Sequence, residues 1–186
     1  MSLLGMNKKL LTLTISNGLT LFASGLLIPY FVVQIINITN NSNLAPIPNA
    51  VTYLGLILSN VYIYTKRSDR AIDERKLLLV GWLSNAIVTL LLLLVLNNLP
   101  IYVFLLFLSG LSLGLTNACF NTLFTKYLDK NIHDKEFSML NIVSYLLLFL
   151  ASILSPFLYS MFGLVGIIVL AGVFQLGSVL LSFKLK

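Results

Sequence analysis

Residues 101–124 read IYVFLLFLSGLSLGLTNACFNTLF, a stretch without a single Asp, Glu, Lys or Arg. A helix needs roughly 20 predominantly apolar residues to cross the hydrocarbon core of a bilayer. A strand of a membrane barrel is about half as long and alternates apolar with polar residues, which this stretch does not do. The stretch therefore predicts a membrane-spanning α-helix.

The rest of the chain repeats this pattern and predicts an all-α fold. Only 10% of the 186 residues are charged, 58% are hydrophobic and the mean hydropathy is +0.97. A soluble domain carries about 25% charged residues. We predict one polytopic domain over residues 1–186, with six spans and no room for a large extramembrane part. The spans run from Leu10 to Ile36, Ala45 to Tyr64, Leu77 to Leu96, Ile101 to Phe124, Phe137 to Tyr159 and Leu164 to Phe183.

The distribution of charge predicts how the chain is threaded. All twelve basic residues lie before the first span, after the sixth, or in the connections that follow the second and fourth spans. The six acidic residues lie in those same two connections, and the other connections are uncharged. The side rich in Lys and Arg is cytoplasmic. We therefore expect both termini in the cytoplasm and the protein to be integral to the cell membrane. The richness of the sequence in Leu, Ile, Asn and Lys is compatible with a bacterial source.

Several function classes receive no support from the sequence. The net charge of +6 lies beside apolar spans, which favours contact with anionic lipid over nucleic acid. Ser112 lies in a Gly-x-Ser-x-Gly pattern, but a nucleophile needs a base within hydrogen-bond reach, and the only histidine, His133, lies beyond the end of that span. One histidine and one cysteine are poor evidence for a metal site. We expect no enzyme activity, no metal and no cofactor.

Polar residues inside the spans are the candidate functional residues. Gly110, Gly114, Asn117 and Asn121 recur at helical spacing on one face of the fourth span. This stripe is compatible with two interpretations. One is close helix packing through Gly110 and Gly114, with the amides bonded to neighbouring helices. The other is the wall of a cavity. We take Asn17, Gln34, Asn117 and Asn121 as candidates for a substrate path.

Asp, Glu, Lys and Arg are absent from all six predicted spans. Proton relays and voltage sensors place such residues inside the membrane despite their cost. If the chain transports a substrate, that substrate is therefore apolar or weakly polar, or a partner supplies the charge.

The connection between the second and third spans carries a resemblance to the major facilitator superfamily. That family often has Gly, three residues, Asp, Arg or Lys, one residue, Gly and two basic residues at this place. Asp69 and Arg70 match the central pair, Thr65 and Ile72 replace the glycines, and the basic pair is displaced to Arg75 and Lys76.

A second resemblance lies in the fourth span and the connection after it. The run from Phe107 to Thr122, followed by Lys135 to Ser138, is similar to the carboxyl-terminal half of drug-efflux members of the same family. The family usually has Gly-Arg where this chain has Asp134 and Lys135.

The resemblance implies two inverted three-helix repeats, at about residues 10–96 and 101–183, with the first and fourth spans lining a central cavity. It also implies twelve spans in the working unit, of which this chain supplies six. The chain would then transport a small substrate by alternating access, either as a homodimer or with a separate amino-terminal half, or it would be a remnant that no longer transports. The alternative is a membrane subunit that transports nothing and binds a partner protein, such as an immunity or accessory protein.

Overall fold

The computed structural model describes residues 7–67, 73–128 and 133–183, and within these ranges it contains helices and no strands. The α-helices are α1 (Lys8–Thr39), α2 (Ile47–Arg67), α3 (Glu74–Leu91), α4 (Leu99–Tyr127) and α5 (His133–Ser182). Two 3-10 turns, Ser42–Leu44 and Leu92–Leu94, precede α2 and extend α3. All five helical segments are long and apolar enough to cross a membrane.

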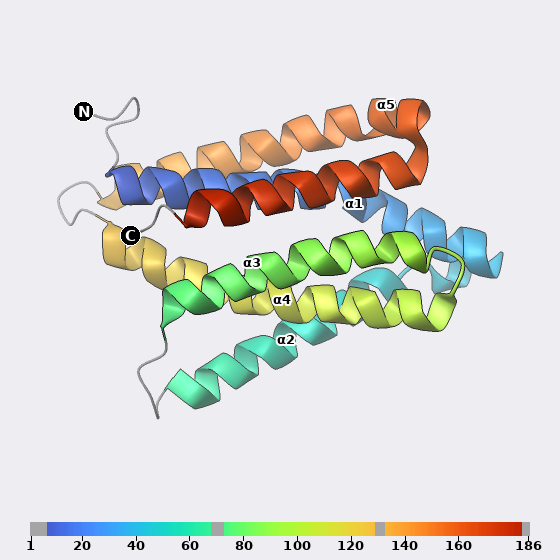
Figure 1. Ribbon diagram of the computed structural model, residues 1–186, viewed down its shortest axis with the longest axis horizontal. Coiled ribbons are helices and arrows are strands. Elements are labelled where there is room, and N and C mark those ends of the chain that lie inside the picture. Colours follow the sequence, from blue (N-terminus) through green and yellow to red (C-terminus); the bar gives the residue numbers. More distant parts are fainter. Residues whose placement is uncertain (1–6, 68–72, 129–132, 184–186) are drawn as a thin grey trace.

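Helix α5 contains both of the last two predicted spans. Figure 1 shows that it runs the length of the molecule and then doubles back. The reversal is at Gly163, whose φ of 64° and ψ of −171° lie in a region that essentially only glycine adopts. We call residues 133–162 the first arm of α5 and residues 164–182 the second arm.

Polar side chains set where the helices begin. Asn7 and Asn98 accept hydrogen bonds from the backbone N–H groups of Lys9 and Ile101 at the starts of α1 and α4. Such caps satisfy N–H groups that have no partner within the helix. Because these residues flank the apolar runs, α1 and α4 are a few residues longer than the predicted spans.

The helices form two layers, which we call the upper and lower sub-bundles. The upper one contains α1 and both arms of α5, and the lower one contains α2, α3 and α4, as Figure 1 shows. Glycines allow close approach within each sub-bundle: Gly25 of α1 faces Ala151 of the first arm, and Gly110 of α4 faces Thr52 of α2. The sub-bundles meet mainly where α3 packs on α5, with Gly172 of the second arm against Leu90.

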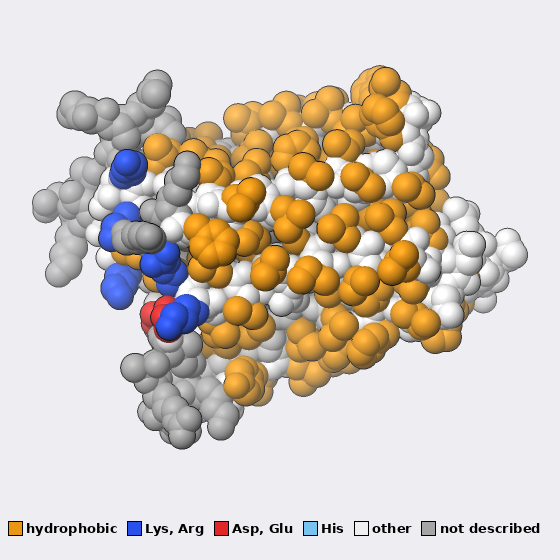
Figure 2. Space-filling view, in the orientation of Figure 1, with side chains coloured by type: hydrophobic (Ala, Val, Ile, Leu, Met, Phe, Trp, Pro, Cys, Tyr) orange, Lys and Arg blue, Asp and Glu red, His pale blue; other side chains and the backbone are white. Residues whose placement is uncertain are grey.

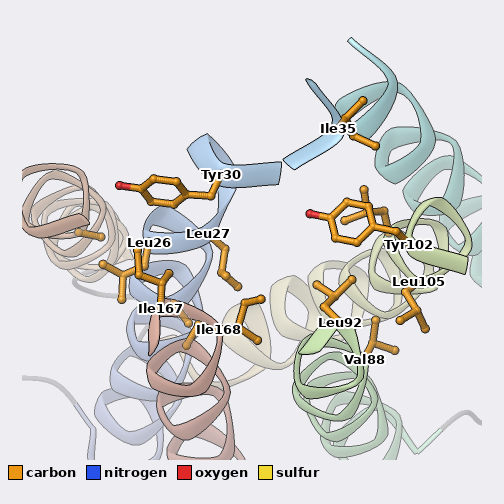
Figure 3. Close-up of a cluster of buried hydrophobic side chains, with 14 residues drawn as sticks. Leu26, Leu27, Tyr30, Ile35, Val88, Leu92, Tyr102, Leu105, Ile167 and Ile168 are labelled. Carbon is orange, nitrogen blue, oxygen red and sulfur yellow. The ribbon is translucent and has the colours of Figure 1, made fainter. Parts of the chain in front are cut away.

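Two clusters of buried apolar side chains fill the interior at different depths. The first includes Leu26 and Leu27 of α1, which lie beside Ile167 and Ile168 of the second arm in Figure 3. The second lies nearer the chain termini and includes Leu13, Leu78, Trp82, Phe120 and Val179. Several buried polar residues, among them Thr20, Asn85, Ser112 and Gln175, lie along their helices between the two clusters.

The surface is apolar along the helices and charged at one end. Figure 2 shows hydrophobic side chains over most of the visible face, and the Lys, Arg, Asp and Glu side chains that it colours lie at the end where the termini lie. The opposite end of that face is polar and uncharged. A band of apolar surface between polar ends is the pattern of a membrane-embedded protein.

Candidate functional site

A cavity of about 140 Å³ lies between the two apolar clusters. Its walls come from all five helices. The lining residues are Ser24, Leu27, Ile28 and Phe31 of α1, Asn49, Thr52, Tyr53 and Leu56 of α2, Asn85 and Thr89 of α3, Ser109 and Leu113 of α4, and Gln175 of α5. No Asp, Glu, Lys, Arg or His is among them. The cavity is therefore apolar with a few neutral polar groups, as small-molecule sites commonly are.

Asn85 and Ser109 form a polar pair on the lower sub-bundle. The Ser109 hydroxyl donates to Asn85 Oδ1 at 2.9 Å, and Asn85 is only 2% exposed. Asn85 lies about 16 Å along α3 from its first residue, at 1.5 Å per residue. This depth is close to the middle of a hydrocarbon core of about 30 Å. An amide buried at that depth needs partners inside the protein.

Gln175 enters the cavity wall from the second arm of α5 and is 2% exposed. Its side-chain Oε1 has no hydrogen-bond partner. Its backbone is held in place, because the Ser178 hydroxyl donates to the Gln175 carbonyl at 2.6 Å. Ser178 in turn accepts from the Thr20 hydroxyl of α1 at 3.2 Å. The backbone carbonyl of Gln175 is thus hydrogen-bonded, whereas the Oε1 atom of its side-chain amide lacks a donor.

The cavity opens between α1 and α2. Ile28 of α1 and Tyr53 of α2 line it and are 49% and 62% exposed, respectively. Few contacts join these two helices. A ligand could enter there without unpacking either sub-bundle.

The structure does not bring the four predicted substrate-path residues together. Gln34 donates through Nε2 to the Leu96 carbonyl at 2.6 Å, which ties the end of α1 to the connection after α3. Asn17 is half-buried on α1, while Asn117 and Asn121 are exposed on α4. Asn121 lines a shallow surface hollow with Thr122, Thr125 and Lys126. None of the four lines the cavity, so their role in a substrate path stays a prediction.

Gly110 and Gly114 lie where α4 meets α2. A Cβ at Gly110 would overlap the backbone of Thr52, and one at Gly114 would overlap the Ser59 hydroxyl and the Leu56 carbonyl. Gly55 of α2 is equally close to the backbone of α4. Small residues on both helices therefore allow the two backbones to touch.

The predicted loop motif is only partly within the described residues. Asp69 and Arg70 lie outside them. Arg75 donates through an Nη atom to the Phe183 carbonyl at 3.3 Å, joining the start of α3 to the end of α5. The Lys76 ammonium lies 3.2 Å from the carboxylate of Asp73, the N-cap of α3.

Asn85 and Gln175 were missed by reasoning from the sequence, which followed stripes of polar residues. Each lies in a segment that is apolar around it, LSNAIV at residues 83–88 and VFQLGS at residues 173–178. The sequence did contain a signal for both residues, because a side-chain amide that faces lipid has a high free-energy cost. An amide surrounded by apolar residues is tolerated when it faces the bundle interior.

A match to a protein-family model shows which family the chain belongs to. The family model of the Major Facilitator Superfamily matches residues 10–186. The chain belongs to this superfamily. It is therefore an integral membrane protein of a family whose members are transporters rather than enzymes.

A solved transporter structure has the same fold. The facilitator chain superposes with a TM-score of 0.77 on the POT family transporter PepTSo, solved in meso, at 16% sequence identity. The superposition covers 95% of this chain and 37% of that transporter. A comparison with curated protein sequences finds no match. The likeness shows the fold, and this chain spans little more than a third of the transporter's length.

Proposed function

We propose that the chain is one half of a secondary transporter that moves a small apolar or weakly polar molecule across a bacterial cell membrane by alternating access. The observation that carries this proposal is the neutral, polar-edged cavity at mid-membrane depth in a bundle of the facilitator fold. The resemblance of the fourth span to drug-efflux members favours export of the molecule.

Six crossings with both termini in the cytoplasm follow from this proposal. The two arms of α5 supply the last two crossings, and the charged end visible in Figure 2 would face the cytoplasm. The packing pattern favours two inverted repeats, because α1 against the first arm of α5 is matched by α4 against α2.

Cysteine labelling in intact cells tests this threading. Cys119 is 3% exposed, so it should give little background with an impermeant maleimide. Asn40→Cys, at the uncharged end of α1, should label in intact cells, and Lys8→Cys should label only after the membrane is opened. Labelling of both positions in intact cells would refute an even number of crossings with cytoplasmic ends.

The working unit contains a second set of spans, either a second copy or a separate amino-terminal half. Light scattering in a mild detergent distinguishes these, because one chain contributes 20.6 kDa. A particle of two such masses supports the homodimer, and a stoichiometric foreign facilitator half supports the split transporter.

Transport itself is tested in vesicles that contain the purified complex. Vesicles loaded with a panel of uncharged fluorescent dyes should release at least one dye faster than protein-free vesicles do. The double variant Asn117→Leu, Asn121→Leu should insert normally and lose this release. Retained release would remove both asparagines from the substrate path.

A non-transporting membrane subunit is the second candidate, and the absence of Asp, Glu, Lys and Arg from the six predicted spans favours it. Such a subunit would copurify with an unrelated membrane protein and release none of the dyes.

A further inference from the structure

One buried acceptor in the cavity wall lacks a donor. Among the described residues, the buried side-chain atoms without a partner belong to Thr14, Ser16, Arg75, Trp82 and Gln175, and of these only Gln175 lines the cavity. A buried carbonyl oxygen that is left unpaired costs the full desolvation penalty of that group, because nothing replaces its hydrogen bonds with water. A group that restores this hydrogen bond is therefore strongly favoured at that point of the cavity.

The neighbouring amide does not present the same opportunity. Asn85 Oδ1 already accepts from the Ser109 hydroxyl. The Oε1 atom of Gln175 therefore differs from the Oδ1 atom of Asn85, which already has a donor. Gln175 Oε1 is the acceptor in the described cavity wall that is buried and lacks a donor, and much of the remaining wall is apolar, including Leu27, Phe31 and Leu113.

Volume and charge restrict the ligand further. A cavity of about 140 Å³ is close in size to an engineered apolar cavity of about 150 Å³ that binds benzene. No Asp, Glu, Lys, Arg or His side chain lines it, and a bare charge at mid-membrane depth is expensive. The part of the ligand that enters is therefore one ring or an equivalent aliphatic group, and it is neutral.

We propose that the cavity binds a small uncharged molecule carrying a hydroxyl or N–H donor on an apolar body, and that Gln175 Oε1 accepts the hydrogen bond from that donor. That this molecule is also the transported substrate rests on the proposed function. The binding itself does not require transport.

Two probes of nearly equal shape test the donor. 4-Fluorophenol and 4-fluorotoluene differ by a hydroxyl in place of a methyl group, and both are neutral at pH 7. Each is titrated into the full-length protein in mild detergent, and binding is followed by fluorine NMR with correction for partition into protein-free micelles. We expect 4-fluorophenol to bind about tenfold more tightly, as one hydrogen bond to a buried acceptor provides.

Substitutions assign the preference to Gln175. In Gln175→Leu the preference for 4-fluorophenol should fall to about onefold, because the acceptor is gone. Asn60→Leu is the control, since it removes an amide that donates to the Leu56 carbonyl within α2 and does not line the cavity. The control should keep the tenfold preference. Gln175→Met replaces Gln175→Leu if the latter does not fold, as judged by fluorescence of Trp82.

The outcomes separate this inference from the proposed function. Equal binding of the two probes by the unmodified protein, or a preference that survives in Gln175→Leu, would overturn the inference, whatever the vesicle assay gives. Loss of the preference in Asn60→Leu would overturn it too. Selective binding by a protein that releases no dye from vesicles supports the inference and refutes the transport function.

Discussion

Gly110→Ala tests the contact between α4 and α2. The added Cβ would overlap the carbonyl oxygen of Thr52 and would lie 2.9 Å from its carbonyl carbon and 3.0 Å from its Cα. Carbon atoms in good contact are about 3.5–4.0 Å apart. All three neighbours are backbone atoms, so no side chain can rotate away and α2 must shift by about 1 Å.

The magnitude combines two opposing effects. Overpacking costs about 1–3 kcal/mol, and the rigid backbone puts this site at the upper end. Alanine in place of a helical glycine returns about 1 kcal/mol. The net loss is then about 2 kcal/mol, which lowers the melting temperature of a protein of this size by about 4–8 °C.

Thermal unfolding in detergent, followed by the fluorescence of Trp82, measures the effect. Trp82 is the only tryptophan and is 1% exposed, so it reports loss of the core. Gly177→Ala is the control, because its Cβ would meet only Leu19 Cδ1 at 3.8 Å, an ordinary contact. The control should melt at or slightly above the temperature of the unmodified protein. If Gly110→Ala melts together with Gly177→Ala, α2 and α4 do not approach as closely as we describe.

Three further changes have defined outcomes. Gly163→Ala should destabilise the reversal of α5 by about 1–3 kcal/mol although its surroundings are open, because φ of 64° with ψ of −171° suits only glycine; an unchanged melting temperature would contradict this. Gln34→Leu should cost about 1 kcal/mol through the lost bond to the Leu96 carbonyl, measured as a fall of about 2–4 °C in melting temperature. The backbone N–H of Lys76 holds the pKa of the Asp73 carboxyl below its ordinary value of 3.8. The cap therefore contributes stability above that pH and loses it as the pH falls through the lower folded-state value. Asp73→Asn should reduce this acid-dependent part of the melting curve, and identical acid profiles would count against the cap.

The apolar runs predicted which segments are helical and where the last two spans separate. Length and absence of charge are sufficient for this, because a backbone in lipid must satisfy its own hydrogen bonds. The connection before Leu164 was visible as a short uncharged break that ends at Gly163, the residue where α5 reverses.

The neighbours of each helix face could not be predicted in the same way. In a soluble protein polar residues mark the outward face, but here the outward face meets lipid and is as apolar as the core. Helix α4 illustrates the problem, since Gly110 and Asn117 share one stripe, yet Gly110 is buried against α2 and Asn117 is exposed. Gln175 was hidden for the same reason, because nothing in its own segment shows that a cavity lies beside it.

The position of the cavity between the two sub-bundles makes the molecule sensitive to the size of its guest. Ser24 and Gln175 belong to the upper wall, and Asn85 and Ser109 belong to the lower wall. A guest larger than about 140 Å³ must either protrude through the opening between α1 and α2 or push the walls apart. Separation of the walls would strain the packed contact of Gly172 with Leu90, which joins the sub-bundles. A guest that separates the walls would in this way change the angle between the upper and lower sub-bundles.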